Sequence, residues 1–220
     1  MKRQDENISP EARRSRWRQR GFLTSRQALV VLGLIFLAPT FVAWIMHQGG
    51  DGGWRPEGMT NQGSLVHPAR PLQMPDGLQA GERPLNDFLQ GMWTLLYIGD
   101  ADCDAVCIDS LYKMRQIRIA QNENMKRVQT LFLLQGDAVP QELALRLADE
   151  YRDLAVVPVS AAQAGQIAPF FAIDGAGMET AERVYFIDPL GNLMMYYGPD
   201  ANPAGMLKDL RKLLKFSRIG

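Results

Sequence analysis

Residues 93–114 read WTLLYIGDADCDAVCIDSLYKM and hold both cysteines of this 220-residue chain. Residues 93–98 are apolar and rich in aromatic and β-branched side chains, and Gly99 ends the run, as is typical of a buried strand. A helix is expected from residue 103 to about residue 121, with Asp102 or Asp104 able to cap its first turn. The two thiols therefore lie where a buried strand leads into a helix.

The sequence after this stretch alternates between strand and helix patterns. Residues 128–134 are a second apolar strand, and Pro140 opens a second helix whose apolar residues recur every four positions. Val156-Val157 is expected to be a short edge strand, and residues 184–197 read as a hairpin. A last helix starts with Asn202 as its cap. Alternating strands and helices predict an α/β fold, a layered sheet with helices on both faces.

A long apolar run precedes the domain. Residues 28–46, ALVVLGLIFLAPTFVAWIM, are 19 residues without a charge, about the length needed to cross a hydrocarbon layer of roughly 30 Å as a helix. We therefore expect an uncleaved transmembrane helix that Pro39 kinks without ending. A cleaved signal peptide is the alternative, but the run is longer than a typical apolar signal core and residues 47–50 lack a small-residue cleavage pattern.

Charge placement predicts the orientation of this span. The tail, residues 1–27, carries eight basic and three acidic residues. By the positive-inside rule the N-terminus stays in the cytoplasm, and the chain after residue 47 lies in a bacterial periplasm or an equivalent space between mitochondrial membranes. Without the tail, the 24 basic and 24 acidic residues fall to 16 and 21. The exported part is thus acidic, which argues against a nucleic-acid partner.

The sequence predicts four parts. The basic cytoplasmic tail covers residues 1–27 and the transmembrane helix residues 28–46. Residues 47–82 are rich in Gly and Pro and are expected to be a linker and extended segment. The compact domain is expected to cover residues 83–220.

Cys103 and Cys107 suit a structural disulfide, a redox couple or a soft-metal site. Residues four apart lie on one helix face, so both sulfurs can reach a common point, and paired thiolates select Cu(I). The spacing also permits a disulfide with Cα atoms about 6 Å apart, toward the long end of the allowed range, so we expect a strained and reducible bond. A disulfide between these residues closes a small ring and restricts little unfolded-chain entropy, so it would add little stability to the fold. Asp100, Asp102 and Asp104 oppose thiolate formation but attract a cation.

Three short motifs carry a resemblance to a known family. They are Leu85-x-Asp87-Phe88-x-x-Gly91-x-Trp93, Cys103-x-x-x-Cys107 and Ile187-Asp188-Pro189-x-Gly191. In this order, over residues 83–216, the chain resembles thioredoxin-fold proteins of the Sco/SenC type, the membrane-tethered copper chaperones and thiol reductases that help assemble cytochrome c oxidase. The LLKxSRIG-like ending at residues 213–220 is similar to that of small single-span proteins associated with bacterial cytochrome oxidase assembly.

The resemblance implies a thioredoxin-like domain, a central sheet flanked by helices, behind one N-terminal transmembrane helix. It implies catalytic and copper-binding roles for Cys103 and Cys107, Cu(I) as cofactor, and a respiratory cytochrome oxidase subunit or its assembly factors as partner. Sco-type copper sites add a histidine where this chain has Thr180. Met178 is the candidate third ligand by softness, with core packing as its alternative role.

Three functions remain open. The first is a cytochrome c oxidase assembly factor that delivers Cu(I) or keeps the acceptor's cysteines reduced. The second is a general membrane-tethered thiol–disulfide oxidoreductase, which is also the enzyme class expected if the chain is catalytic. The third is a non-enzymatic assembly scaffold with a degenerate thioredoxin fold. The expected location is the inner (cytoplasmic) membrane, single-pass, with a cytoplasmic N-terminus and a periplasmic C-terminal domain.

Other residues have structural explanations. His47 and His67, the only histidines, are expected to be solvated, since neither lies in the predicted domain. One of Met194 and Met195 should face the core by strand alternation. Four basic residues of the last helix suit either anionic lipid or a solvated face: Lys208, Arg211, Lys212 and Lys215.

Overall fold

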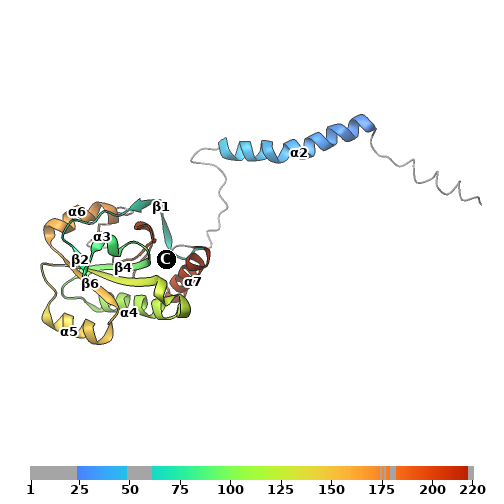
Figure 1. Ribbon diagram of the computed structural model, residues 1–220. Coiled ribbons are helices and arrows are strands. Elements are labelled where there is room, and N and C mark those ends of the chain that lie inside the picture. The colour runs from blue at the N-terminus through green and yellow to red at the C-terminus, as the bar shows by residue number, and fades with distance from the viewer. Residues whose placement is uncertain (1–23, 49–60, 174, 176, 179–181, 218–220) are drawn as a thin grey trace, which may run out of the picture. The chain divides into compact units, whose positions relative to one another are not determined.

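The computed structural model describes residues 24–48, 61–173, 175, 177, 178 and 182–217 (Figure 1). The chain divides into two compact units, Met1–Gly58 and Met59–Gly220, and each is described by itself. Residues 1–23 of the predicted tail, residues 49–60 of the predicted linker, Thr180 and the chain end from residue 218 lie outside the described residues.

The first unit contains one long helix, α2 (Ser25–Gln48). Within it, Ser25–Trp44 is long and apolar enough to cross a membrane, by length and composition. None of the side chains described in this segment is buried within its own unit. Pro39 lies inside the helix, which continues past it as predicted. Length and composition do not by themselves separate such a span from a signal sequence.

The second unit is built on a sheet of six strands in the order β1-β8-β7-β4-β5-β6. Strands β4, β5 and β6 run parallel, whereas β7, β8 and β1 extend the other edge with antiparallel pairs. A two-stranded ladder pairs β2 (Gln79–Ala80) with β3 (Arg83–Pro84). The strands of the main sheet are β1 (Ser64–Pro71), β4 (Trp93–Asp100), β5 (Val128–Gln135), β6 (Leu154–Val159), β7 (Val184–Ile187) and β8 (Asn192–Tyr197).

Helices α4, α5 and α7 of this unit were expected from the sequence, whereas the short α3 and the 3₁₀ helix η2 were not. The cap predicted at Asn202 is confirmed, since its side chain accepts a hydrogen bond from the Ala204 N–H. The longer helix α6 was also not expected, because Gly165 and Pro169 obscure its pattern; a capping box between Ser160 and Gln163 starts it. The helical elements are α3 (Leu85–Phe88), α4 (Ala105–Ile119), the 3₁₀ helix η2 (Asn122–Arg127), α5 (Gln141–Glu150), α6 (Ala161–Phe171) and α7 (Pro203–Phe216).

Helices cover both faces of the sheet, as expected for a layered α/β domain (Figure 1). Alternation along β4 shows the two layers: Leu95 and Tyr97 belong to one buried cluster, with side chains of α4, α5 and α7. Leu96 and Ile98 belong to the second, with side chains of α3 and α6. β4 is therefore the central strand of two cores.

The folded unit begins earlier than the predicted boundary at residue 83. Strand β1 lies within the expected linker and pairs with β8. Just before it, the backbone N–H groups of Gln62 and Gly63 donate to Asp209 Oδ2 of α7, at 2.6 and 3.0 Å, and the Tyr197 hydroxyl donates to the same oxygen at 2.8 Å. This strand was not predicted because Pro68 and Pro71 interrupt its pattern. Proline is tolerated in edge strands, and β1 is an edge strand of the sheet.

The close packing around Gly63, just before β1, predicts that alanine substitution at two glycines changes the stability of the protein in opposite directions. A Cβ added at Gly63 would lie 2.5 Å from Tyr197 Cζ and 2.8 Å from the Met195 sulfur, whereas a Cβ at Gly165 in α6 would meet nothing within 4 Å. We expect Gly63→Ala to lower the free energy of unfolding by about 1–3 kcal/mol through overpacking.

The matched control is Gly165→Ala, which should raise the free energy of unfolding by roughly 0.5–1 kcal/mol through helix propensity. Urea unfolding followed by circular dichroism measures both. Equal stability of the two variants would mean that Gly63 is not packed closely against Tyr197 and Met195 of β8.

Candidate thiol site

The two cysteines lie in the turn from β4 into α4. The Asp104 side chain caps the helix by accepting a hydrogen bond from the Cys107 N–H at 2.9 Å. This settles the choice between the two predicted caps and places Cys107 in the first turn. Cys103 precedes the helix, and its φ of +37° lies in the left-handed region. This conformation costs a non-glycine residue about 1–2 kcal/mol, so the surrounding contacts must hold it.

The sulfurs of Cys103 and Cys107 form a disulfide whose Cα atoms are 5.1 Å apart. The expected separation of about 6 Å assumed that both residues are helical, and it is wrong because α4 begins two residues after Cys103. A separation of 5.1 Å is ordinary for a disulfide, so the Cα spacing does not strain the bond. Both residues are buried, at 4% and 3% exposed. Attack on the bond must therefore come through the hollows that flank it.

A small hollow of about 120 Å³ is lined by both cysteines and by acidic side chains. Four carboxylates line it, those of Asp100, Asp102, Asp104 and Glu182. The N-terminus of α4 favours a thiolate, whereas these negative charges oppose one and attract a cation.

Tyr97 also lines this hollow and was not singled out by the sequence. Burial, followed by the negative charges of Glu182 and Asp104, raises its pKa to about 12, although a hydrogen bond with Ser110 acts in the opposite direction. Its hydroxyl is therefore protonated at neutral pH. Gly99 leaves room for the ring, because a Cβ there would lie 2.9 Å from Tyr97 Cε1. Alternation along β4 places Tyr97 on the thiol face. Its position in the same hollow as Glu182 depends on the pairing of β4 with β7, which is distant in sequence.

A wider groove of about 590 Å³ opens on the other side of Cys103, between α4 and α5. Ile108 and the exposed Tyr112 of α4 line it, together with Arg146 and Tyr151 of the α5 region. Cys103 borders both hollows and Cys107 only the smaller one. Cys103 is therefore the cysteine that borders the wider groove.

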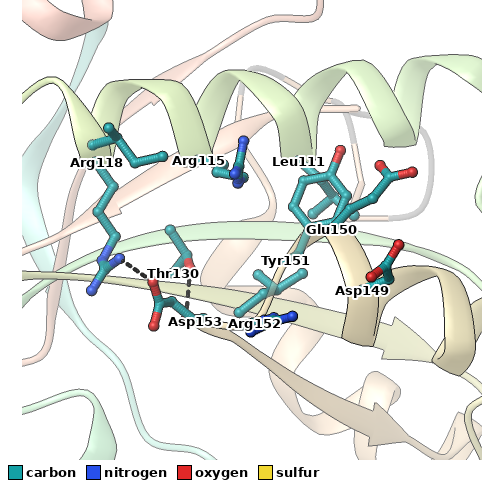
Figure 2. A pocket seen from close by; sticks show the side chains of 11 residues that line it. Leu111, Arg115, Arg118, Thr130, Asp149, Glu150, Tyr151, Arg152 and Asp153 are labelled. Carbon is teal, nitrogen blue, oxygen red and sulfur yellow. Dashed lines mark hydrogen bonds and ion pairs between the residues drawn. The ribbon is translucent and has the colours of Figure 1, made fainter.

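The groove borders a further pocket of about 310 Å³ through Tyr151 (Figure 2). In that pocket Arg118 donates to the Val128 carbonyl and to Asp153, both at 2.8 Å, and Thr130 donates to the Asp153 carbonyl. These contacts tie α4 to β5 and to the start of β6. They give Arg118 and Asp153, drawn in Figure 2, a structural role.

The structure does not bring the proposed third ligand to the thiols. Met178 belongs to the buried cluster on the α3 and α6 side of the sheet, whereas Cys103 and Cys107 belong to the opposite cluster. His67 is exposed on β1. Within the part of the chain that the structure describes, no group of three or more His, Cys, Asp and Glu side chains is placed to hold a metal ion.

Comparison with known families gives the identity of the domain. Residues 93–217 match the family described as the transmembrane-like, thioredoxin-like C-terminal domain. The chain belongs to this family. The thioredoxin-like fold expected from the sequence is thereby confirmed. A search of curated proteins finds no match.

Solved structures of Sco proteins share the fold of this thioredoxin-like domain. Copper-bound ScoI of Arabidopsis thaliana is 18% identical, with a TM-score of 0.52 over 70% of this chain and 99% of that one. Copper-bound ScoI of Bradyrhizobium japonicum is 18% identical, with a TM-score of 0.50 over 61% and 94%. BsSco, a member of the Sco family of cytochrome c oxidase assembly proteins in which a disulfide switch was identified, is 12% identical, with a TM-score of 0.50 over 70% and 99%. Such low identity establishes the fold alone.

The position of Asp104 predicts how the charge beside the thiols affects their reactivity. Asp104→Asn keeps a capping side chain but removes a negative charge, so the thiolate fraction of the reduced protein should increase. We expect alkylation at neutral pH to be a few-fold faster than in the wild type, as measured by iodoacetamide kinetics and mass spectrometry.

Asp104→Ala is the comparison variant. It removes the same charge but also the helix cap, at a cost of about 1 kcal/mol in stability. If Asp104→Asn reacts no faster than the wild type, the carboxylate does not control thiolate formation.

Proposed function

We propose that this protein acts in cytochrome oxidase assembly as a membrane-tethered carrier of a reversible cysteine pair, which reduces the acceptor's cysteines or delivers Cu(I). The observation that carries the proposal is the pairing of Cys103 and Cys107 at the start of α4, bordered by two hollows. The shared fold with copper-bound Sco proteins supports it. A bond that closes so short a loop adds little stability, which favours a chemical role over a structural one.

In the reductive reaction the dithiol form is the electron donor. The Cys103 thiolate attacks one sulfur of the acceptor's disulfide, forms a mixed disulfide and releases one acceptor thiolate. Cys107 then attacks Cys103, which closes the disulfide seen here and releases the second acceptor thiolate. Two electrons pass to the acceptor, and a separate dithiol reductant must restore the pair. Cys103 is assigned the first attack because it borders both hollows.

In the metal reaction the reduced pair holds Cu(I) as cargo. Two convergent thiolates match the softness of Cu(I), and the carboxylates of Asp100, Asp102, Asp104 and Glu182 attract the incoming cation. Met178 lies in the opposite core cluster, which supports packing rather than ligation as its role. The disulfide must open before copper binds, because both states use the same sulfurs.

A general thiol–disulfide oxidoreductase is the second candidate. The groove beside Cys103, with Ile108 and exposed Tyr112, favours it, since such a groove suits an extended protein substrate. Turnover on unrelated protein disulfides would distinguish this function from oxidase assembly.

The copper proposal predicts a selective effect of cysteine substitution. The anaerobically reduced full-length protein should retain about one Cu(I) against a competing chelator, and Cys103→Ser or Cys107→Ser should abolish retention. Met178→Leu is the matched control, because it removes a thioether but keeps volume in the other core cluster. We expect its affinity for Cu(I) to equal that of the wild type.

Oxidase activity in cells provides the second measurement. The double cysteine variant should reduce copper loading of the oxidase, whereas Met178→Leu should not. If the reduced wild type holds no copper but reduces an acceptor disulfide, delivery is excluded and the reductase role remains. Normal oxidase activity in the double variant would leave only a scaffold role.

The location follows from the proposed anchor. We propose that α2 spans the inner membrane once, with the basic tail in the cytoplasm and Met59–Gly220 in the periplasm. A phosphatase reporter fused after Gly220 should be active, because that enzyme folds only outside the cytoplasm. Replacing the basic residues before Ser25 with neutral ones should lower reporter activity, whereas a cytoplasmic reporter active at the same site would reverse the topology.

A further inference from the structure

The groove between α4 and α5 is lined by a buried tyrosine whose hydroxyl lacks a partner. Tyr151 follows α5, is 6% exposed and packs in the same buried cluster as the thiols. Its hydroxyl makes no hydrogen bond with the residues that the structure describes, and it is open to solvent, whereas the unpaired hydroxyl of Tyr185 is closed off in the core. Figure 2 shows the Tyr151 hydroxyl pointing toward α4. A fixed polar group without a partner in an open groove points to a ligand that forms hydrogen bonds.

The charges around this hydroxyl keep it protonated at neutral pH. Burial, followed by the negative charge of Glu150, raises the pKa of Tyr151 above its ordinary value, although Arg115 and Arg146 act in the opposite direction. The hydroxyl is therefore a donor that can also accept a hydrogen bond. A peptide backbone satisfies such a group, because it offers a carbonyl acceptor at every residue and an N–H donor at nearly all.

An apolar strip of α4 lines the same groove. Ala105, Ile108 and Tyr112 all line it, and their spacing of three and four positions places them on one helix face. This face starts two residues after Cys103, and Tyr112 is 53% exposed. Exposed aromatic side chains are enriched where proteins contact one another. An apolar side chain near the acceptor's cysteine can therefore pack against this strip.

The charges on the groove favour an acceptor of one sign. Three carboxylates and one guanidinium line it, those of Asp104, Asp109, Glu150 and Arg146. Lys113 pairs with Asp109 at 2.7 Å, which leaves two carboxylates against one guanidinium. The small hollow on the other side of Cys103 adds further carboxylates. Charge complementarity thus favours basic residues, rather than acidic ones, beside the acceptor's cysteine.

We propose that this groove binds the cysteine-bearing segment of the acceptor polypeptide in an extended conformation, and that it selects segments with apolar and basic residues beside the cysteine. The proposal rests on the reductive reaction proposed above and names its substrate class. The Tyr151 hydroxyl donates to a backbone carbonyl of the segment, Tyr112 contacts its apolar side chain and Glu150 pairs with its basic side chain. The acceptor's sulfur is thereby held beside Cys103.

Disulfide exchange between the full-length protein and a synthetic peptide tests the proposal. The Cys107→Ser variant stops the reaction at the mixed disulfide. The probe is Gly-Phe-Lys-Cys-Lys-Phe-Gly with thionitrobenzoate on its cysteine, and its symmetric sequence allows either chain direction. The Cys103 thiolate forms a disulfide with the peptide's cysteine, and thionitrobenzoate leaves with the electron pair of the broken bond. Absorbance measures the rate, and mass spectrometry confirms the peptide adduct.

The reference compound is N-acetylcysteine amide with the same leaving group, which has no flanking residues. We expect the peptide to react about tenfold faster than the reference, and Tyr151→Phe to lower this ratio about fivefold, the effect of one hydrogen bond. Tyr112→Ala should lower the ratio a few-fold through lost apolar contact. Leu145→Ala is the matched control, because Leu145 is an exposed apolar residue of α5 that does not line the groove, and it should leave the ratio unchanged.

A second peptide, with glutamate in place of both lysines, tests the selection by charge. The lysine peptide should react a few-fold faster, and Glu150→Gln should reduce this preference about twofold, as for an exposed ion pair. Glu142→Gln is the control on α5, because Glu142 is exposed and does not line the groove. Its preference should equal that of the Cys107→Ser variant without further substitution.

Three results would overturn the proposal while leaving the thiol chemistry intact. They are a ratio of peptide to reference near one, equal ratios in Tyr151→Phe and Leu145→Ala, and equal rates for the lysine and glutamate peptides. Failure of Cys103 to react even with the reference compound would instead overturn the proposed reduction, and this proposal with it.

Discussion

Strand β4 is hydrogen-bonded along both edges and buried on both faces, and its position determines where the rest of the domain can pack. β5 pairs with one edge in parallel and β7 with the other in the antiparallel direction. Successive side chains of β4 enter different cores, Leu95 and Tyr97 on one face and Leu96 and Ile98 on the other. A slip of one residue would exchange the two faces, so register is strongly specified. The thiols follow directly from this strand, so their position depends on the same register.

Local sequence signals were sufficient where a structural feature depends on neighbouring residues. Strand β4, which runs one residue past the predicted end at Gly99, the buried face of α4 and the caps of α4 and α7 follow from residues within one or two turns. Long-range features were not predictable in this way. β1 forms because β8 offers it a partner and Asp209 accepts two backbone N–H groups before it. The two hydrogen bonds to Asp209 connect segments more than 140 positions apart, whereas the prolines of the β1 sequence interrupt a local strand pattern.

At the thiol site, too, features that depend on local sequence were predicted, and features that depend on distant segments were not. The pairing of Cys103 with Cys107 was expected from their spacing, but the left-handed conformation of Cys103 was not, because the helix starts later than the pattern indicated. Tyr97 and Glu182 come together through the pairing of β4 with β7, which local spacing does not reveal. Met178 was a candidate copper ligand because its side chain contains sulfur. Its place in the opposite core cluster depends on which face of the sheet the preceding loop covers.

The two proposed activities of the cysteine pair are thermodynamically coupled because they compete for the same sulfurs. In the proposed metal reaction Cu(I) binds only the reduced form, so copper would stabilise that form by RT ln(1 + [Cu]/Kd). Each tenfold increase of free Cu(I) above the dissociation constant favours the dithiol by about 1.4 kcal/mol, which for a two-electron couple corresponds to roughly 30 mV. The acidic hollow acts in the same direction, since it disfavours free thiolates but attracts the cation that neutralises them. A pair in this setting is therefore expected to be closed when copper is scarce and open when copper is available, so that one site links metal supply to disulfide chemistry.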